Sequence, residues 1–221
     1  MNALQDLIKI YASQYKEQVV EWRRHIHSHP ELSGEEKNTS LFIQKVLGEL
    51  GIPFVNDISD HAVIGKIEGA HTGPVIALRA DMDALPIHEI TGLPFASQNE
   101  GVMHACGHDG HATIGLGVAK VLMSIKDQLH GTVKLIFQPA EEGVRGAKSI
   151  VDNGHLDGVD YLIGSHVTNK KEDDPAVVIP GSYGSLATTK YDVIFHGKSS
   201  HAGGSPEVGR NVMLAVGTAI L

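Results

Sequence analysis

The sequence contains a single cysteine, Cys106, among its 221 residues. One cysteine cannot form an internal disulfide, so nothing in the chain calls for an oxidising compartment, and we expect a cytoplasmic location. No apolar run approaches the roughly 20 residues that a membrane-spanning helix needs. The amphipathic, charge-interrupted N-terminus also differs from a secretory signal. The sequence therefore predicts a protein with no membrane partner.

Positive charge is in the minority, with 18 Lys and Arg against 26 Asp and Glu and a formal net charge of −8. Contact with phosphate groups requires clustered Lys and Arg, so we expect no nucleic-acid partner. The hydrophobic content of 42% and charged content of 20% are typical of a globular chain. The length is sufficient for one full core and part of a second domain.

Hydrophobic periodicity predicts one helix up to about His29, before Pro30, and a second helix that Gly51 stops. Short β-rich runs follow, with one further helical stretch among them; the runs cover residues 63–67, 75–78, 133–137 and 161–163, and the helical stretch covers 111–125. This alternation predicts an α/β fold with a mixed, mostly parallel sheet sandwiched by helices. The pattern changes near Ser182, so we expect a first domain over residues 1–181 and the start of a smaller α+β domain over 182–221, with a helix from Pro206.

The segment MHACGHDGH concentrates metal-ligand residue types; it contains His104, Cys106, His108, Asp109 and His111. Imidazole and thiolate suit zinc, manganese, cobalt or nickel, and the intervening glycines allow the backbone to turn tightly. One alternative is a buried structural cysteine beside turn glycines. Another is a cysteine nucleophile with His108 or His166 as its base, although such a nucleophile needs neither paired glutamates nor so many histidines.

Three other polar segments follow β-rich runs, where the carboxyl ends of parallel strands collect ligands; they contain Asp81 and Asp83, Glu141 and Glu142, and His166. Adjacent glutamates alone usually mark a solvated surface, and an isolated histidine is more often a core or loop residue. Here Pro139 ends the strand, so both carboxylates lie at its rim. One glutamate can then bind metal while the other moves a proton, as metal-assisted amide hydrolysis requires.

Six motifs in order give the chain a family resemblance: WRRHIHSHPELSGEE, LRADMDALP, MHACGHDGH, IFQPAEEG, GSHV and GKSSHAG. The chain resembles the zinc-type aminoacylase and carboxypeptidase family of metallopeptidases, in the branch that contains hippurate hydrolase and auxin-conjugate hydrolases. Within this branch, residues 129–154 and 185–203 look most like p-aminobenzoyl-glutamate hydrolases. The resemblance implies a catalytic metal-binding domain followed by a lid or dimerisation domain.

The resemblance also implies roles for individual residues. Two divalent ions of manganese, zinc, cobalt or nickel would be bound by four ligands: Cys106, His108, Glu142 and His166. Glu141 would act as the general base, Asp83 would orient a ligand, and His201 of the lid would stabilise the oxyanion, often across a dimer. Asp81 stands where other branches carry a ligating histidine, so its role stays open, as do those of His104 and His111. We expect His25, His27 and His29 to be structural.

The implied activity is hydrolysis of the amide bond in a small-molecule substrate, either an N-acyl amino acid or an aminobenzoyl-glutamate-like conjugate. The implied partner is a second copy, giving a homodimer, or a related second subunit bound through the lid domain. Two other hypotheses stay open, namely a non-catalytic metal-binding or subunit-forming fragment and a cysteine-nucleophile hydrolase.

Full-length relatives are longer, return from the lid into the catalytic domain and supply a last ligating histidine near their C-terminus. This chain ends in the first lid helix, as a truncated gene product, a partial chain or a fragment complemented by another chain would. We therefore expect the 221-residue chain alone to bind metal weakly and to hydrolyse little.

Overall fold

The structure, a computed structural model, describes residues 3–56, 61–143, 146–167 and 193–220. The chain divides into two compact units, residues 1–173 and 174–221. The domain boundary predicted at 181/182 lies outside the described residues, so this assignment stays a prediction. Within the described ranges, no helix is both long and apolar enough to cross a membrane.

The first unit is built on a five-stranded sheet with the strand order β1-β2-β4-β3-β5. The strands are β1 (Phe54–Val55), β2 (Val63–Glu68), β3 (His71–Asp81), β4 (His130–Gln138) and β5 (Tyr161–Gly164). β3 runs parallel to both β4 and β5, whereas β2 is antiparallel to both β1 and β4. The mixed sheet matches the prediction, and its parallel part carries the polar segments that the sequence singled out.

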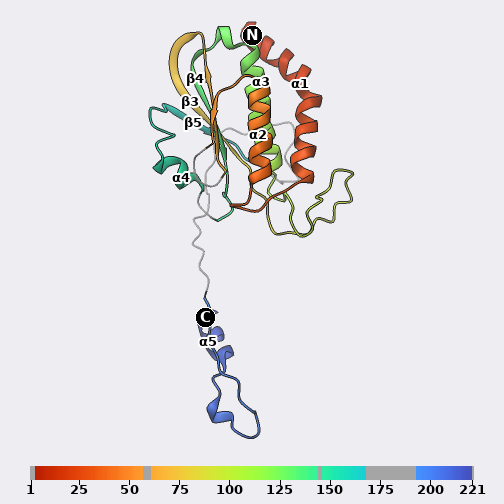
Figure 1. Cartoon of the computed structure of the whole chain (residues 1–221), viewed down its shortest axis with the longest axis vertical. Helices are drawn as coiled ribbons and strands as arrows, with labels where there is room; N and C mark the ends of the chain where they lie inside the picture. Colours follow the sequence, from red (N-terminus) through yellow and green to blue (C-terminus); the bar gives the residue numbers. More distant parts are fainter. Residues whose placement is uncertain (1–2, 57–60, 144–145, 168–192, 221) are drawn as a thin grey trace. The chain divides into compact units, whose positions relative to one another are not determined.

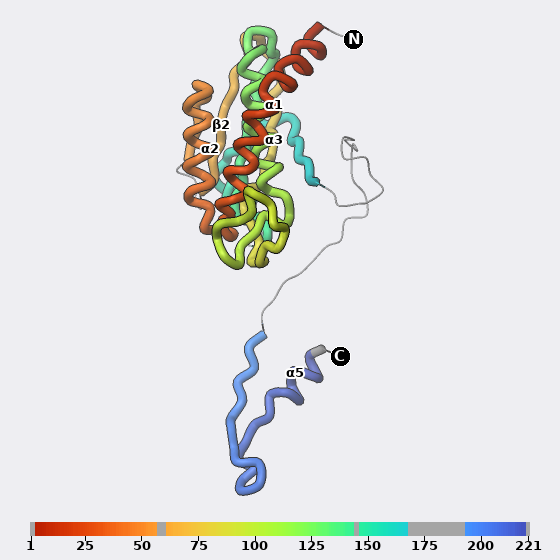
Figure 2. Tube along the Cα trace, turned by 90° about the vertical axis from the view of Figure 1, so that its right-hand side faces the viewer, coloured from red at the N-terminus to blue at the C-terminus, as the bar shows by residue number. Residues whose placement is uncertain are grey.

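Helices cover both faces of this sheet, as predicted. On one face lie α1 (Ala3–Ser28), α2 (Lys37–Glu49) and α3 (His108–Ser124), while α4 (Gly146–Asp152) lies on the other (Figures 1 and 2). The first helix ends at Ser28, before Pro30, because the residue that precedes a proline disfavours the helical conformation. Gly51 follows α2 with a φ of +69°, a left-handed conformation in which glycine is favoured.

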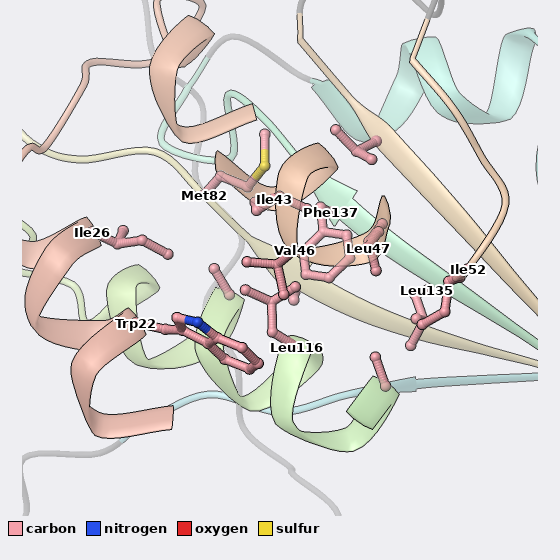
Figure 3. Close-up of a cluster of buried hydrophobic side chains, with 14 of the residues drawn as sticks. Trp22, Ile26, Ile43, Val46, Leu47, Ile52, Met82, Leu116, Leu135 and Phe137 are labelled. Atoms are coloured by element: carbon pink, nitrogen blue, oxygen red, sulfur yellow. The ribbon is translucent and has the colours of Figure 1, made fainter. Parts of the chain in front are cut away.

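Strand alternation divides the core between the two faces. In β4, Leu135 and Phe137 join the cluster formed with α1, α2 and α3 (Figure 3), whereas Ile136 joins a smaller cluster that includes Ile150 of α4. Trp22 contributes to the larger cluster from α1. Each fully buried large apolar side chain contributes roughly 1.5–3 kcal/mol. Packing against the helices therefore stabilises the sheet next to the edge that carries the polar segments.

The second unit corrects one prediction. The helix expected from Pro206 is only a 3₁₀ turn, η2 (Pro206–Val208), and α5 begins at Val212 and ends at Ile220. The backbone between them is extended at Gly209, with φ −79° and ψ 159°, and Arg210 forms an isolated bridge with Lys198. The side chain of Asn211 then accepts a hydrogen bond from the Met213 N–H at 2.9 Å. This cap starts α5, because it satisfies an amide that has no partner within the helix.

Candidate metal centre

The parallel strands bring separate polar segments to one edge of the sheet. Asp81 pairs with Gln138 across β3 and β4, and Arg79 pairs with Gly164 across β3 and β5. The three carboxyl ends therefore lie side by side, as the sequence predicts from the rule for parallel sheets. The amino end of α3 reaches the same edge, because His108 contacts Asp83.

Five side chains converge at this edge. The ligand atoms of Cys106, His108 and His166 all lie within 4.8 Å of one another. A second overlapping group, with the same spacing, contains His108, Glu141 and Glu142. The structure thus brings together every residue of this unit to which the family resemblance gives the role of a metal ligand or a general base.

His108 is oriented by Asp83. Its Nδ1 lies 3.0 Å from Asp83 Oδ1 and 2.9 Å from the Asp83 carbonyl oxygen, so it donates a proton to them. Its Nε2 is buried and has no hydrogen-bond partner among the described residues. A histidine held by a carboxylate on one nitrogen, with the other nitrogen left bare, is typical of a metal ligand. This buried bare nitrogen, beside a cysteine sulfur and carboxylates, fits a divalent metal ion.

His166 has a similar arrangement at the end of β5. Its Nδ1 donates to the carbonyl oxygen of Val167 at 2.6 Å. In the neutral ring this leaves Nε2 unprotonated, and Nε2 lies 3.3 Å from the Cys106 Sγ. The tautomer therefore presents a lone pair to the cluster, which suits metal binding.

Asp83 is the central acceptor of the centre. Its side chain is fully buried, and it accepts hydrogen bonds from the Ser33 hydroxyl at 2.6 Å and from the Glu142 N–H at 2.9 Å. Burial raises the pKa of Asp83, but the hydrogen bonds from His108, Ser33 and Glu142 outweigh it and lower the pKa to about 2. Asp83 is therefore an anion at neutral pH, and it links His108 to the glutamate segment.

Cys106 lies in an environment that disfavours its thiolate. Burial and then the neighbouring carboxylates, first Glu142 and then Glu141, raise the pKa of the thiol to about 12. Without a bound cation the thiol therefore stays protonated at neutral pH. A cysteine nucleophile needs the opposite environment, one that lowers the thiol pKa. The pairing with His166 resembles that of a nucleophile, but the negative surroundings favour a metal ligand.

Gly107 shapes the turn between Cys106 and α3. Its φ is +80°, and a Cβ at this position would lie 2.4 Å from Val167 Cγ2. Both the left-handed backbone and the close approach require glycine. The glycine thus allows Cys106 and His108, two residues apart, to direct their side chains to one point.

Asp81 and His111 pair with each other beside the cluster. His111 Nδ1 lies 3.1 Å from Asp81 Oδ2, and its Nε2 lies 3.3 Å from the Ser165 hydroxyl. Asp81 also forms an ion pair with Arg79 at 2.7 Å. Both residues are therefore engaged in local contacts, and neither belongs to the two ligand groups.

His27 and Asp109 belong to a buried polar network behind the centre. Asp109 Oδ2 accepts from His27 Nδ1 and from Arg23 Nε, each at 2.9 Å, and His27 Nε2 lies 3.2 Å from Glu89. Burial raises the pKa of Asp109, but the His27 hydrogen bond and nearby cations lower it to about 2. These contacts tie α1 to the first turn of α3, a structural arrangement consistent with the prediction for His27.

His104 is buried beside this network, and neither of its ring nitrogens has a hydrogen-bond partner in the described part of the chain. Burial lowers its pKa to about 4, so the ring is neutral at physiological pH. It is absent from both ligand groups.

Two residues that contact the centre were missed at the sequence level. Ser33 donates to Asp83, and the buried Glu36 accepts from the Ala140 N–H at 2.7 Å. Both lie in the connection between α1 and α2, within the SGEE part of the first motif. That motif was the available signal, but sequence separations of 50 and 104 residues conceal both contacts.

His201 lies in the second unit. Its Nδ1 accepts hydrogen bonds from the N–H groups of Gly203 and Gly204, at 3.2 and 2.9 Å. The imidazole thus organises its own turn, and its role toward the substrate stays a prediction.

Comparison with known proteins identifies the family. Residues 77–214 match the sequence profile of peptidase family M20/M25/M40, and the chain belongs to this family. It is 45% identical over 192 residues to the N-acetyl-L-cysteine deacetylase of Bacillus subtilis. It is 47% identical over 167 residues to one subunit of the p-aminobenzoyl-glutamate hydrolase of Escherichia coli. These alignments cover 86% and 72% of this chain.

The fold is similar to that of a crystal structure from Bacillus subtilis described as a dinuclear metal binding peptidase from the M20 family. The two share 43% identity with a TM-score of 0.68 over 73% of this chain and 44% of that one. The chain also spans less than half of the two curated relatives, 45% of the deacetylase and 38% of the hydrolase subunit. The resemblance inferred from the motifs is confirmed at the level of the family.

Proposed function

We propose that this chain provides the metal-binding part of an amidohydrolase that cleaves the amide bond of N-acyl amino acids or aminobenzoyl-glutamate-like conjugates. The observation that carries the proposal is the convergence of five donor side chains around a buried, bare His108 nitrogen that Asp83 orients. Relatives named as a deacetylase, an N-acyl-L-amino acid amidohydrolase and a p-aminobenzoyl-glutamate hydrolase subunit support the substrate class.

In this proposal four residues hold two divalent ions: Cys106, His108, Glu142 and His166. The donor set of thiolate, imidazole and carboxylate suits manganese, zinc, cobalt or nickel. When bound, such ions polarise a carbonyl group and lower the pKa of water from about 16 to about 7. Asp83 accepts hydrogen bonds from the His108 ring and from the backbone N–H of Glu142, and so positions both residues.

Glu141 is the proposed general base. Its side chain is 39% exposed, so unlike the buried Asp83 it is accessible to water and substrate. It accepts the proton of the attacking water and delivers it to the departing amine, a transfer that a carboxylate at this rim can perform. The Arg79 guanidinium lies 4.0 Å from Glu141 Oε1. The resemblance gives His201, of this chain or of a second copy, the role of donating a hydrogen bond to the developing oxyanion.

The test compares the wild type with Glu141→Gln after loading with Mn²⁺ or Zn²⁺. Substrates are N-acetyl amino acids and p-aminobenzoyl-glutamate, and metal content is measured alongside release of the free amine. The substitution keeps the side-chain shape but removes the base, so we expect it to abolish even the low turnover of the metal-loaded wild type while metal content is unchanged. Activity retained by Glu141→Gln would refute the assignment of the base.

The cysteine hydrolase hypothesis makes the opposite prediction for chelators. A nucleophilic Cys106 would give activity that survives chelation but disappears in Cys106→Ser. We expect chelation to remove activity, because the raised thiol pKa leaves Cys106 protonated without a cation. A non-catalytic metal-binding role is the second candidate, since the cluster of ligand atoms can bind a metal ion whether or not catalysis follows. Metal binding without turnover of either substrate would favour it.

We also propose a cytoplasmic location and association with a second copy or a related subunit through the second unit. The single cysteine supports the first point, and the Escherichia coli relative, which is named as a subunit of its hydrolase, supports the second. Light scattering on the purified chain, alone and mixed with a related subunit, tests association. A monomeric mass in both samples would contradict the proposed association.

A further inference from the structure

The segment that carries Glu141 and Glu142 adopts a strained backbone conformation. Ala140, directly before the two glutamates, has a φ of +54°. A residue with a Cβ rarely adopts this left-handed region, at a cost of roughly 1–2 kcal/mol. Something outside the segment must therefore hold Ala140 in place if the glutamates are to keep their positions.

Glu36 provides that contact. Its carboxylate Oε1 accepts the Ala140 N–H at 2.7 Å, across 104 residues of sequence. Glu36 occupies the N-cap position of α2, but its side chain makes no capping hydrogen bond there. The carboxylate instead accepts hydrogen bonds from its own backbone and that of Gly34, and from the distant Ala140 N–H.

This contact is costly for the fold by itself. Glu36 is fully buried, its Oε2 has no hydrogen-bond partner among the described residues, and burial raises its pKa to about 6. An apolar side chain could fill the same space without this desolvation cost. Of the backbone hydrogen bonds that the carboxylate accepts, the one from the Ala140 N–H is the one that joins Glu36 to the glutamate segment.

Two buried carboxylates thus bracket Glu141. Glu36 accepts a hydrogen bond from the N–H of Ala140, the residue before Glu141. Asp83 accepts one at 2.9 Å from the N–H of Glu142, the residue after Glu141. We propose that Glu36 is a positioning residue, which fixes the left-handed bend at Ala140 and thereby places Glu141 and Glu142 for proton transfer and metal binding. This inference rests on the proposed function for the roles of the two glutamates.

The test uses two substitutions at Glu36. Glu36→Met removes the acceptor but keeps a similar volume, whereas Glu36→Gln keeps an acceptor oxygen. Glu35→Met is the matched control, because Glu35 is the exposed neighbour. Zn²⁺ affinity is measured by chelator competition, and Co²⁺ absorption reports whether the Cys106 thiolate still binds metal.

We expect Glu36→Met to weaken Zn²⁺ binding about tenfold, within the range typical for partners that orient metal ligands. Glu36→Gln should stay within about threefold of the wild type, because one accepting oxygen remains. Adding Ala140→Gly to Glu36→Met should recover about fivefold, since glycine adopts the bend without the penalty of a Cβ. In the wild-type background, Ala140→Gly should change the affinity less than twofold. A merely structural role for Glu36 would not predict this rescue.

The inference is overturned if Glu36→Met binds Zn²⁺ within twofold of the Glu35→Met control, or if Ala140→Gly restores nothing. Hydrogen exchange at the Ala140 amide in metal-free protein gives a reading that needs no metal site, and Glu36→Met should accelerate it. A wild type that exchanges slowly at Ala140 but binds no metal would refute the proposed function while leaving the backbone contact intact. Metal binding unaffected by Glu36→Met would refute only this inference.

Discussion

Replacing Asp83 with asparagine removes the acceptor on which the centre depends. The carboxylate accepts from the Ser33 hydroxyl, the His108 ring and the Glu142 N–H. An asparagine has the same shape, but its NH₂ group must face one of these donors. At least one donor then loses its acceptor in a buried site.

The magnitude follows from the pKa of Asp83, which the fold lowers from 3.8 to about 2. A decrease of about 1.8 units corresponds to about 2.5 kcal/mol. Because the folded-state pKa is below the unfolded one, this contribution is present above about pH 4 and is lost as the pH falls toward 2. We expect Asp83→Asn to lower the free energy of unfolding by about 2 to 3 kcal/mol at neutral pH, and to weaken Zn²⁺ binding about 10- to 100-fold.

Urea unfolding of metal-free protein measures the first effect, and chelator competition measures the second. Asp127→Asn is the matched control, because Asp127 is exposed in the 3₁₀ turn η1 (Lys126–Gln128). If Asp83→Asn unfolds within about 0.5 kcal/mol of this control, the range of an ordinary surface substitution, the Asp83 hydrogen bonds do not stabilise the centre as argued.

Three further predictions test the surroundings of the site. Gly107→Ala should destabilise the metal-free fold by at least about 1 kcal/mol, because Gly107 has a left-handed φ and an added Cβ would collide with Val167. Gly110→Ala is the control: a Cβ at this position of α3 meets no atom within 4 Å, so the substitution should stabilise the fold by roughly 0.5–1 kcal/mol. Equal effects of the two substitutions in thermal unfolding would contradict the argument that the turn requires glycine at position 107. The pKa of Glu36 is raised from 4.5 to about 6, so ionisation of Glu36 lowers the free energy of unfolding as the pH rises through this range. The free energy of unfolding of Glu36→Gln should therefore rise relative to that of the wild type by up to about 2 kcal/mol between those pH values. A difference that does not change with pH would be inconsistent with a buried carboxylate that ionises. Phe137→Ala should cost about 3–5 kcal/mol in urea unfolding, and a loss below about 1 kcal/mol would mean that the core adjoining the site is not closely packed.

The sequence predicted the order and type of the main elements in the first unit because their periodicity is strong and local. The helix before Pro30, the helix stopped by Gly51 and the four longer strands all follow from such patterns. The start of the last helix was predicted wrongly, at Pro206 instead of Val212. Proline suits the first position of a 3₁₀ turn as well as that of an α-helix, and the turn does not continue because the backbone is extended at Gly209 and Arg210 bridges Lys198.

The sequence by itself determined which residues could carry the chemistry. Ligand-type side chains after successive strands, together with the density at Cys106 and His108, were sufficient to predict the cluster, because parallel strands place their carboxyl ends together. Only the tertiary structure decided how these residues are held. It paired Asp81 with His111 and turned the bare nitrogen of His108 toward the cluster. It also brought Glu36 to Ala140, a contact that depends on packing between distant segments and leaves no periodic signal in the chain.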